Sequence, residues 1–200
     1  QNIAGVLAFL GSNGIVRDRF QVVQTIDDEA TGLQAMAVQV TQTQLVIAYA
    51  GTNPLDASDL KMDMTTIVAK QNLPSSENSQ QHQKAEKFYQ AVQAEYPDRI
   101  IMLTGHSLGG FLALYVACRQ RLGATVYNAP DPCQMLADMP PERELKLINY
   151  RHVYDAMGNF AGNGTGAEVF SNRRFFLART PFVYHGIASW RFDSNGKIER

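Results

Sequence analysis

Short apolar runs alternate with longer amphipathic stretches along much of the chain. Five runs are short and apolar enough to predict strands: residues 35–40, 44–50, 99–104, 124–128 and 145–150. The run at 44–50 is apolar at nearly every position, which is typical of a strand covered on both faces. Two longer stretches carry apolar side chains at helical spacing and predict helices: residues 79–94 and 108–121. This alternation predicts an α/β fold, with a mostly parallel central sheet and helices on both of its faces.

Polar segments and turn signals mark the remaining organisation of the chain. Residues 72–80 are polar and contain Pro and Ser, and residues 130–141 are rich in proline. Both are therefore expected to be connecting segments. Near the C-terminus, the strand-like runs 187–192 and 197–199 flank Asp193-Ser194-Asn195-Gly196, and this Asn-Gly turn sequence predicts a β-hairpin.

The segment Gly105-His106-Ser107-Leu108-Gly109 fits Gly-x-Ser-x-Gly, the pattern of a nucleophile elbow. A predicted strand ends just before it and a predicted helix begins at its serine, as this turn requires. Such a turn strains the serine backbone and exposes the hydroxyl above the sheet edge. The small residues on either side let strand and helix pass closely. Ser107 is therefore the candidate nucleophile, and the alternative is an ordinary serine that caps a helix.

A serine hydroxyl needs a general base to take its proton, and usually an acid to orient that base. In α/β-hydrolases these residues follow the serine in the order acid, then histidine. Two histidines follow Ser107, namely His152 and His185. His185 is favoured because it lies in a predicted loop, 181–186, from which it can reach back over the sheet edge. His152 lies within or just after a strand, where a structural histidine is the common case.

Six carboxylates are candidates for the acid: Asp131, Asp138, Glu142, Glu144, Asp155 and Glu168. The acid should stand at the carboxyl end of a strand, on the same rim as the serine. Asp155 follows the predicted strand 145–150 and is preferred. Asp131 follows the strand 124–128 and is the competitor. A purely structural Asp155 would form a turn or cap a helix.

Ester cleavage by such a serine also needs an oxyanion hole, made of two N–H donors aimed at the developing charge. One donor is expected from Leu108, the residue after the nucleophile. The other is expected from the segment Ala50-Gly51-Thr52-Asn53, which follows the apolar strand 44–50. Gly51 allows close approach of the backbone, and Thr52 offers its N–H and its hydroxyl. Leu108 and Thr52 are therefore the candidate oxyanion residues, and the reaction requires no metal or cofactor.

These segments together resemble the class 3 (fungal-type) lipase family of the α/β-hydrolases, most closely its bacterial lipase and phospholipase-like branch. The resemblance runs from about residue 35 to the C-terminus. Its carrying residues are 47–52, the run Gly-His-Ser-Leu-Gly-Gly at 105–110, Tyr127-Asn128-Ala129-Pro130, residues 149–155, and His185 ahead of 192–196. The resemblance implies Ser107 as nucleophile, Asp155 as acid, His185 as base, and Thr52 with Leu108 as oxyanion hole. It also implies a lipid or other carboxylic ester as the substrate.

The chain departs from this family at one position, and its sequence does not decide whether it has the family's lid. Ala50 stands where the family usually has Arg, a residue that orders the neighbouring loop. The family's lid corresponds to residues 53–70, which include a short amphipathic pattern at 59–69. Six apolar residues there would form one face: Leu55, Leu60, Met62, Met64, Ile67 and Val68. Such a stripe is more often core packing than a lid.

The composition of the chain limits which classes of partner we expect it to bind. Of the 200 residues, 45% are hydrophobic and 10% aromatic, which excludes a disordered chain. Lys and Arg number 18 against 19 Asp and Glu, and this balance argues against nucleic acid as a partner. No apolar run is long enough to span a bilayer. The near-zero charge gives little electrostatic attraction to anionic lipid, so peripheral membrane contact would rest on apolar residues.

We expect residues 1–200 to form a single α/β-hydrolase catalytic domain. Because the chain opens without Met and stops after a predicted hairpin strand, we expect it to be cut from a longer protein. The resemblance favours secretion and an accessory domain or secretion partner outside these residues. Cys118 and Cys133 do not define the compartment, and two thiols are expected rather than a disulfide. The competing functions are an inactive hydrolase-fold binding module and a peptidase on the same fold.

Overall fold

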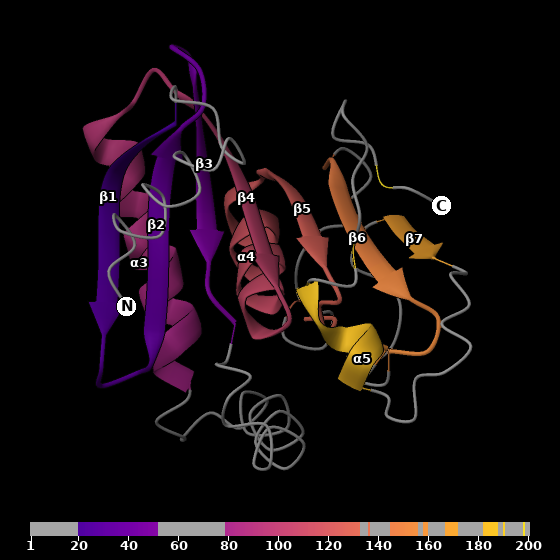
Figure 1. Ribbon diagram of the computed structural model, residues 1–200. Coiled ribbons are helices and arrows are strands. Elements are labelled where there is room, and N and C mark those ends of the chain that lie inside the picture. The colour runs from indigo at the N-terminus through magenta and orange to yellow at the C-terminus, as the bar shows by residue number, and fades with distance from the viewer. Residues whose placement is uncertain are drawn as a thin grey trace.

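The computed structural model describes residues 20–51, 79–132, 136, 145–155, 158–159, 167–171, 182–187, 190 and 198. Within these residues, seven strands form one sheet in the order β1-β2-β3-β4-β5-β6-β7 (Figure 1). The strands are β1 Gln21–Asp28, β2 Leu33–Gln39, β3 Gln44–Tyr49, β4 Ile100–His106, β5 Gly123–Tyr127, β6 Leu147–His152 and β7 Ala167–Ser171. The helices are α3 Ser79–Glu95, α4 Leu108–Gln120 and α5 Phe182–His185.

The sheet is parallel from β3 to β7 and antiparallel at its N-terminal edge. β1 pairs with β2, and β2 with β3, in antiparallel fashion, whereas each later neighbour is parallel. The expected mostly parallel α/β sheet is therefore confirmed. The parallel strands point their carboxyl ends to one edge, where α5 lies (Figure 1).

The long helices α3 and α4 pack against each other on the same face, behind the sheet in Figure 1. This placement follows from topology. The crossovers β3-α3-β4 and β4-α4-β5 step across the sheet in one direction, and right-handed crossovers then place both helices on one side. The prediction of helices on the opposite face has no counterpart among the described residues.

Helix α4 is the centre of the hydrophobic core. Every residue from Leu108 to Cys118 is buried, because the sequence Leu-Gly-Gly-Phe-Leu-Ala-Leu-Tyr-Val-Ala-Cys is apolar or small on all sides. The helix packs on β3, β4, β5 and α3. In β3, Leu45, Ile47 and Tyr49 are fully buried while the residues between them are partly buried, so its apolar run alternates in burial after all.

Several predictions of elements need correction. The strands β1 and β7 were not predicted, because both are edge strands and their sequences, QVVQTIDD and AEVFS, mix polar and apolar residues without a clean period. The predicted strand 187–192 does not begin at Ile187, whose carbonyl accepts the N–H of Trp190 in a turn, at 3.1 Å. The predicted helix 59–69, the Asn-Gly turn of the hairpin and most of the segments 72–80 and 130–141 lie outside the described residues.

Close backbone packing at the start of α4 generates the first prediction. A Cβ on Gly109 would overlap the backbone of Tyr49 and Ala50 at the end of β3. Ala is favoured over Gly inside a helix by about 1 kcal/mol. The overlap reverses that sign because backbone atoms have no rotamer to change. We expect Gly109→Ala to lower the free energy of unfolding by about 3 kcal/mol or more, measured by urea denaturation.

Gly123→Ala is the matched control. A Cβ at Gly123 would meet its nearest atoms, Met102 Cε and the Lys146 carbonyl oxygen, at 3.5 and 3.6 Å, which is ordinary van der Waals contact. Its stability should therefore change by no more than about 1 kcal/mol. Equal stability of the two variants would contradict the close approach of α4 to β3.

Candidate active site

Ser107 occupies the turn between β4 and α4 in a strained conformation. Its backbone has φ 57° and ψ −126°, outside the regions that a residue with a Cβ readily adopts. Although it immediately precedes α4, its side chain makes no capping hydrogen bond to the helix. The alternative of an ordinary capping serine is therefore wrong, and the hydroxyl is directed elsewhere.

Glycines let three backbones meet around this turn. A Cβ on Gly105 would overlap the carbonyl of Gly109, the second residue of α4. A Cβ on Gly51, after β3, would lie 2.6 Å from the carbonyl oxygen of His106 and 3.5 Å from Cβ of Ser107. The segment that leads into the predicted oxyanion residue Thr52 thus runs directly against Ser107. Thr52 itself and the lid candidate 53–70 lie outside the described residues.

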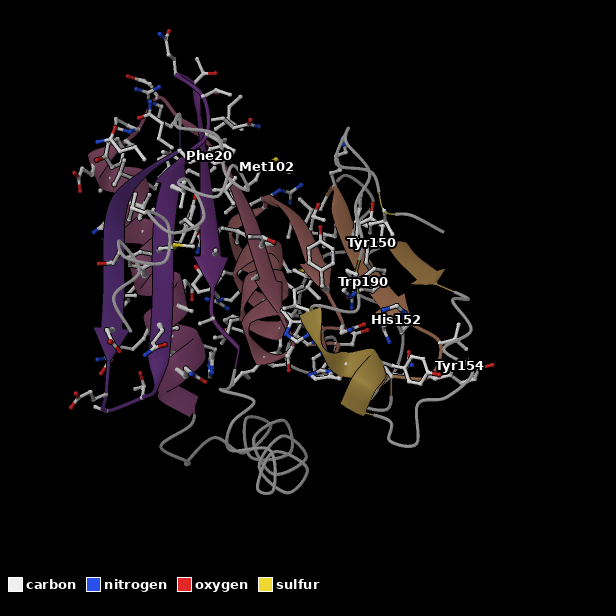
Figure 2. The ribbon with its side chains drawn as sticks, viewed as in Figure 1. Phe20, Met102, Tyr150, His152, Tyr154 and Trp190 are labelled. Carbon is white, nitrogen blue, oxygen red and sulfur yellow. The ribbon has the colours of Figure 1, made fainter. Side chains whose placement is uncertain are left out.

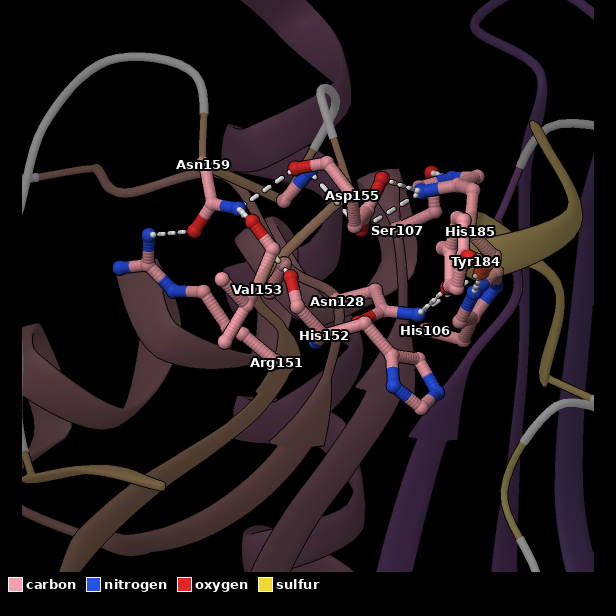
Figure 3. Close-up of polar contacts among 12 residues, drawn as sticks. His106, Ser107, Asn128, Arg151, His152, Val153, Asp155, Asn159, Tyr184 and His185 are labelled. Carbon is pink, nitrogen blue, oxygen red and sulfur yellow. Dashed lines mark hydrogen bonds and ion pairs between the residues drawn. The ribbon is translucent and has the colours of Figure 1, made fainter. Parts of the chain in front are cut away.

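The structure brings the side chains of Ser107, Asp155 and His185 together (Figure 3). Nε2 of His185 lies 2.8 Å from Oγ of Ser107, and Nδ1 of His185 lies 3.1 Å from both carboxylate oxygens of Asp155. A carboxylate accepts hydrogen bonds, so Nδ1 carries the proton and donates it to Asp155. The lone pair of Nε2 then faces the Ser107 hydroxyl, which is the tautomer a general base needs.

Asp155 is held in a buried turn that follows β6. Its side chain is fully buried, and Oδ2 accepts the N–H of Gly158 at 3.0 Å. Its own N–H donates to the carbonyl of His152, and its carbonyl accepts Nδ2 of Asn159 at 2.7 Å. The carboxylate is therefore fixed by its backbone on one side and by Gly158 and His185 on the other.

The alternative candidates, His152 for the base and Asp131 for the acid, lie in other surroundings. The ring of His152 stacks on Trp190 with centroids 4.2 Å apart and also contacts Tyr184, so it belongs to an aromatic cluster at β6 (Figure 2). Asp131 is buried, and its charge acts on the guanidinium of Arg151. The imidazole that contacts both Ser107 and Asp155 is that of His185.

Arg151 is a buried cation near the site, and the sequence analysis did not assign it a role. It is 1% exposed and is the largest of the fully buried side chains. Desolvation lowers the pKa of its guanidinium, while the charges of Asp131 and Asp155 oppose that shift. Its Nη1 donates to Oδ1 of Asn159 at 3.4 Å. Arg151 thus supplies positive charge beneath the turn that carries Asp155.

His106 and Asn128 are two further residues that the sequence reasoning did not assign. Nε2 of His106 lies 2.5 Å from the carbonyl oxygen of His185, so Nε2 carries a proton and donates it. The pKa of His106 is lowered to about 4, chiefly by burial and also by the charge of the nearby His185, although the backbone hydrogen bond and the charge of Asp155 act in the opposite direction. Asn128 donates Nδ2 to the carbonyls of Tyr184 and His185, at 2.9 Å each.

Leu108, the predicted oxyanion donor, directly follows Ser107 in the chain. It is the first residue of α4, so its N–H has no acceptor within the helix. The positive end of the helix dipole adds to the potential at this point.

His185 lies in the one-turn helix α5 and not in the predicted loop. Four residues are too few for any helical period to be visible in the sequence. The correction does not change which side chains meet.

The described residues also bear on metal binding and on membrane spanning. No group of His, Cys, Asp and Glu among them is arranged to hold a metal ion. Among the described helices, none combines the length and apolar character that a bilayer span needs.

Three solved structures with a similar fold are described as lipases. M37 lipase aligns with a TM-score of 0.56 at 16% identity, over 79% of this chain and 60% of its own. The Rhizomucor miehei lipase in a propeptide complex aligns with 0.54 at 16%, over 76% and 56%. Lipase II from Rhizopus niveus aligns with 0.52 at 14%, over 78% and 68%. At these identities the likeness shows the fold, and the chain spans little more than half the length of the Rhizomucor miehei lipase chain.

Comparison with curated proteins gives no significant match. The sequence itself matches a phospholipase-like family, the Tle-like phospholipase domain, over residues 6–133. That match covers more than half of the chain and includes the elbow at Ser107. The chain therefore belongs to the Tle-like phospholipase domain family.

Proposed function

We propose that this chain is a serine hydrolase that cleaves carboxylic esters of lipids, most specifically the acyl esters of phospholipids. The observation that carries the proposal is the Ser107–His185–Asp155 geometry, with Oγ to Nε2 at 2.8 Å and Nδ1 to the carboxylate at 3.1 Å. The strained backbone of Ser107 and membership of the phospholipase family support it.

In the first step, Nε2 of His185 takes the hydroxyl proton of Ser107 while Oγ attacks the ester carbonyl carbon. The carbonyl π electrons move onto oxygen and form a tetrahedral oxyanion. Asp155 stabilises the imidazolium through the Nδ1–H hydrogen bond without taking the proton itself. When the oxyanion collapses, the carbon–oxygen bond to the alcohol breaks, and His185 returns its proton to the leaving alkoxide oxygen.

The oxyanion forms beside the start of α4 in this scheme. We propose the N–H of Leu108 as one donor and the N–H or hydroxyl of Thr52 as the other. The close contact of Gly51 with His106 and Ser107 supports the second assignment, because Thr52 follows Gly51 directly. Two such donors, aimed at the developing negative charge, stabilise the transition state more than the neutral ester.

Water completes the cycle. His185 takes a proton from water, the hydroxide oxygen attacks the acyl carbon, and the bond from that carbon to Oγ of Ser107 breaks as His185 reprotonates Oγ. A fatty acid leaves, and Ser107 is regenerated. Every proton that is removed is returned, and no bond is oxidised or reduced in the cycle.

Exposed apolar side chains beside the site support a lipid substrate. Val153 and Tyr154 directly precede Asp155, and Ile187 follows His185 by two residues; all three are exposed. Tyr154 extends outward from the end of β6 (Figure 2). We propose that residues 1–200 act as one catalytic domain that contacts a lipid surface peripherally through these residues.

Removal of the nucleophile is the first test. We expect a fluorophosphonate probe to label the wild-type protein and to leave Ser107→Ala unlabelled, because phosphonylation requires Oγ activated by His185. Labelling is measured by intact-protein mass spectrometry. A wild-type protein that resists the probe, or a Ser107→Ala variant that reacts as fast, would end the proposal and favour an inactive binding module.

Exchange of the acid is the second test. Asp155→Asn keeps the shape but can present an N–H to Nδ1, which favours the wrong tautomer of His185. We expect kcat for a short-chain ester to fall by about 10³–10⁴-fold. The matched variant Asp131→Asn removes the competing buried carboxylate and should retain kcat within about tenfold. A larger loss in Asp131→Asn than in Asp155→Asn would reverse the assignment of the acid.

The substrate class is tested with a mixed panel. We expect mass spectrometry of the products from phospholipids, acylglycerols and acylated peptides to show free fatty acid released from phospholipid at the highest kcat/KM. Cleavage of amide bonds with no release of fatty acid would favour the peptidase alternative.

A further inference from the structure

The helix that carries His185 cannot fix its own position. α5 comprises the four residues Phe182–His185, and a helix this short is unstable by itself in water. No backbone N–H of the same helix donates to the carbonyl groups at its C-terminal end. The imidazole lies 2.8 Å from Oγ of Ser107 and 3.1 Å from the carboxylate of Asp155. Contacts with other segments must therefore hold it in that position.

Those contacts converge on two carbonyl groups. The carbonyl of His185 accepts Nε2–H of His106 at 2.5 Å and Nδ2–H of Asn128 at 2.9 Å. The second hydrogen of the same amide nitrogen goes to the carbonyl of Tyr184, also at 2.9 Å. Figure 3 shows His106 and Asn128 meeting Tyr184 and His185 from below. The His185 carbonyl thereby accepts two hydrogen bonds from outside α5.

The other end of Asn128 holds the strand that leads to the acid. Its Oδ1 accepts the backbone N–H of His152 at 3.1 Å, and its own N–H donates to the carbonyl of Tyr150 at 2.7 Å. His152 begins the turn that closes on Asp155. The side chain is completely buried, so every polar atom of its amide is used within the protein. One amide thus joins the segment of the base to the segment of the acid.

We propose that Asn128 and His106 are positioning residues, which hold the His185 imidazole against Asp155 and Ser107 by clamping the carbonyls of Tyr184 and His185. The clamp rests on the proposed function for its role in catalysis, but its geometry is independent of it. Asn128 adopts φ 47°, a left-handed conformation that Asn and Asp tolerate better than other residues with a Cβ. Asn alone combines that tolerance with two donated hydrogens.

His106 adds a second property to the clamp. Its burial keeps it neutral near pH 7, and its ring centroid lies 4.9 Å from that of His185. A charged group at this distance would oppose the imidazolium that His185 becomes during the reaction. A neutral donor holds the carbonyl without that cost.

The test compares matched variants at both clamp residues. Asn128→Asp keeps size and left-handed tolerance but replaces the donated hydrogens with a carboxylate that repels the two carbonyls. His106→Leu removes the second donor, and His106→Gln restores an N–H at a similar reach. We expect kcat to fall about 10- to 100-fold in Asn128→Asp and His106→Leu with KM within twofold, because a small misplacement of a catalytic group has this effect. His106→Gln should recover most of the loss.

A readout independent of catalysis separates this proposal from the proposed function. We expect the downfield proton NMR resonance of the His185 Nδ1–H, assigned by its loss in His185→Gln, to shift or broaden in Asn128→Asp and His106→Leu. If the wild type cleaves no ester while this resonance responds to the clamp variants, the function fails and the clamp stands. If His106→Leu and Asn128→Asp fold and leave both kcat and the resonance unchanged, the clamp is overturned. If Asn128→Asp does not fold, the comparison of His106→Leu with His106→Gln decides alone.

Discussion

The contact on which the site depends is backbone against backbone, where α4 begins. Gly105 and Gly109 allow β4, the end of β3 and the first turn of α4 to pass closer than any Cβ permits. That packing forces Ser107 to φ 57° and turns its hydroxyl away from the helix end it would otherwise cap. It also leaves the N–H of Leu108, at the positive end of the helix dipole, beside the hydroxyl. A single steric constraint thus accounts for the direction of the Ser107 hydroxyl and for the position of the Leu108 N–H, on which the proposed nucleophile and oxyanion donor rest.

Buried hydrogen bonds extend this rigid point to the other two residues. Asp155 and His185 come from segments that follow β6 and lie in α5, far along the chain from Ser107. Their positions are tied to the sheet through Asn128 after β5, Asn159 beneath the acid turn, and His106 beside the nucleophile. In a buried setting each unmade hydrogen bond costs about 1–3 kcal/mol, so these amides and imidazoles favour one arrangement over others.

The sequence predicted the parts of this arrangement that are local. The elbow is readable because its glycines, its serine and the flanking strand and helix lie within a few residues. The chain order leaves two histidines and six carboxylates after it, and their places relative to the predicted strands and loops made Asp155 and His185 the preferred candidates. His106 and Asn128 escaped because their partners are main-chain carbonyls 56 to 79 positions away, which no sequence pattern encodes. The signals were present as a histidine inside the elbow and an asparagine ending a strand. Likewise β1, β7 and the one-turn α5 owe their form to neighbours and not to their own periodicity.

Capture of the covalent intermediate is the sharpest test of Ser107 as the nucleophile. The enzyme is mixed with a slowly deacylating ester, quenched in acid, digested with trypsin and analysed by mass spectrometry. Residues 100–119 form one tryptic peptide, and Ser107 is the only serine within it. The account predicts the mass of one acyl group on that peptide, located at Ser107 by fragmentation, together with one equivalent of released alcohol. Release of alcohol with no acyl group on Ser107, or an acyl group on another residue, would contradict it.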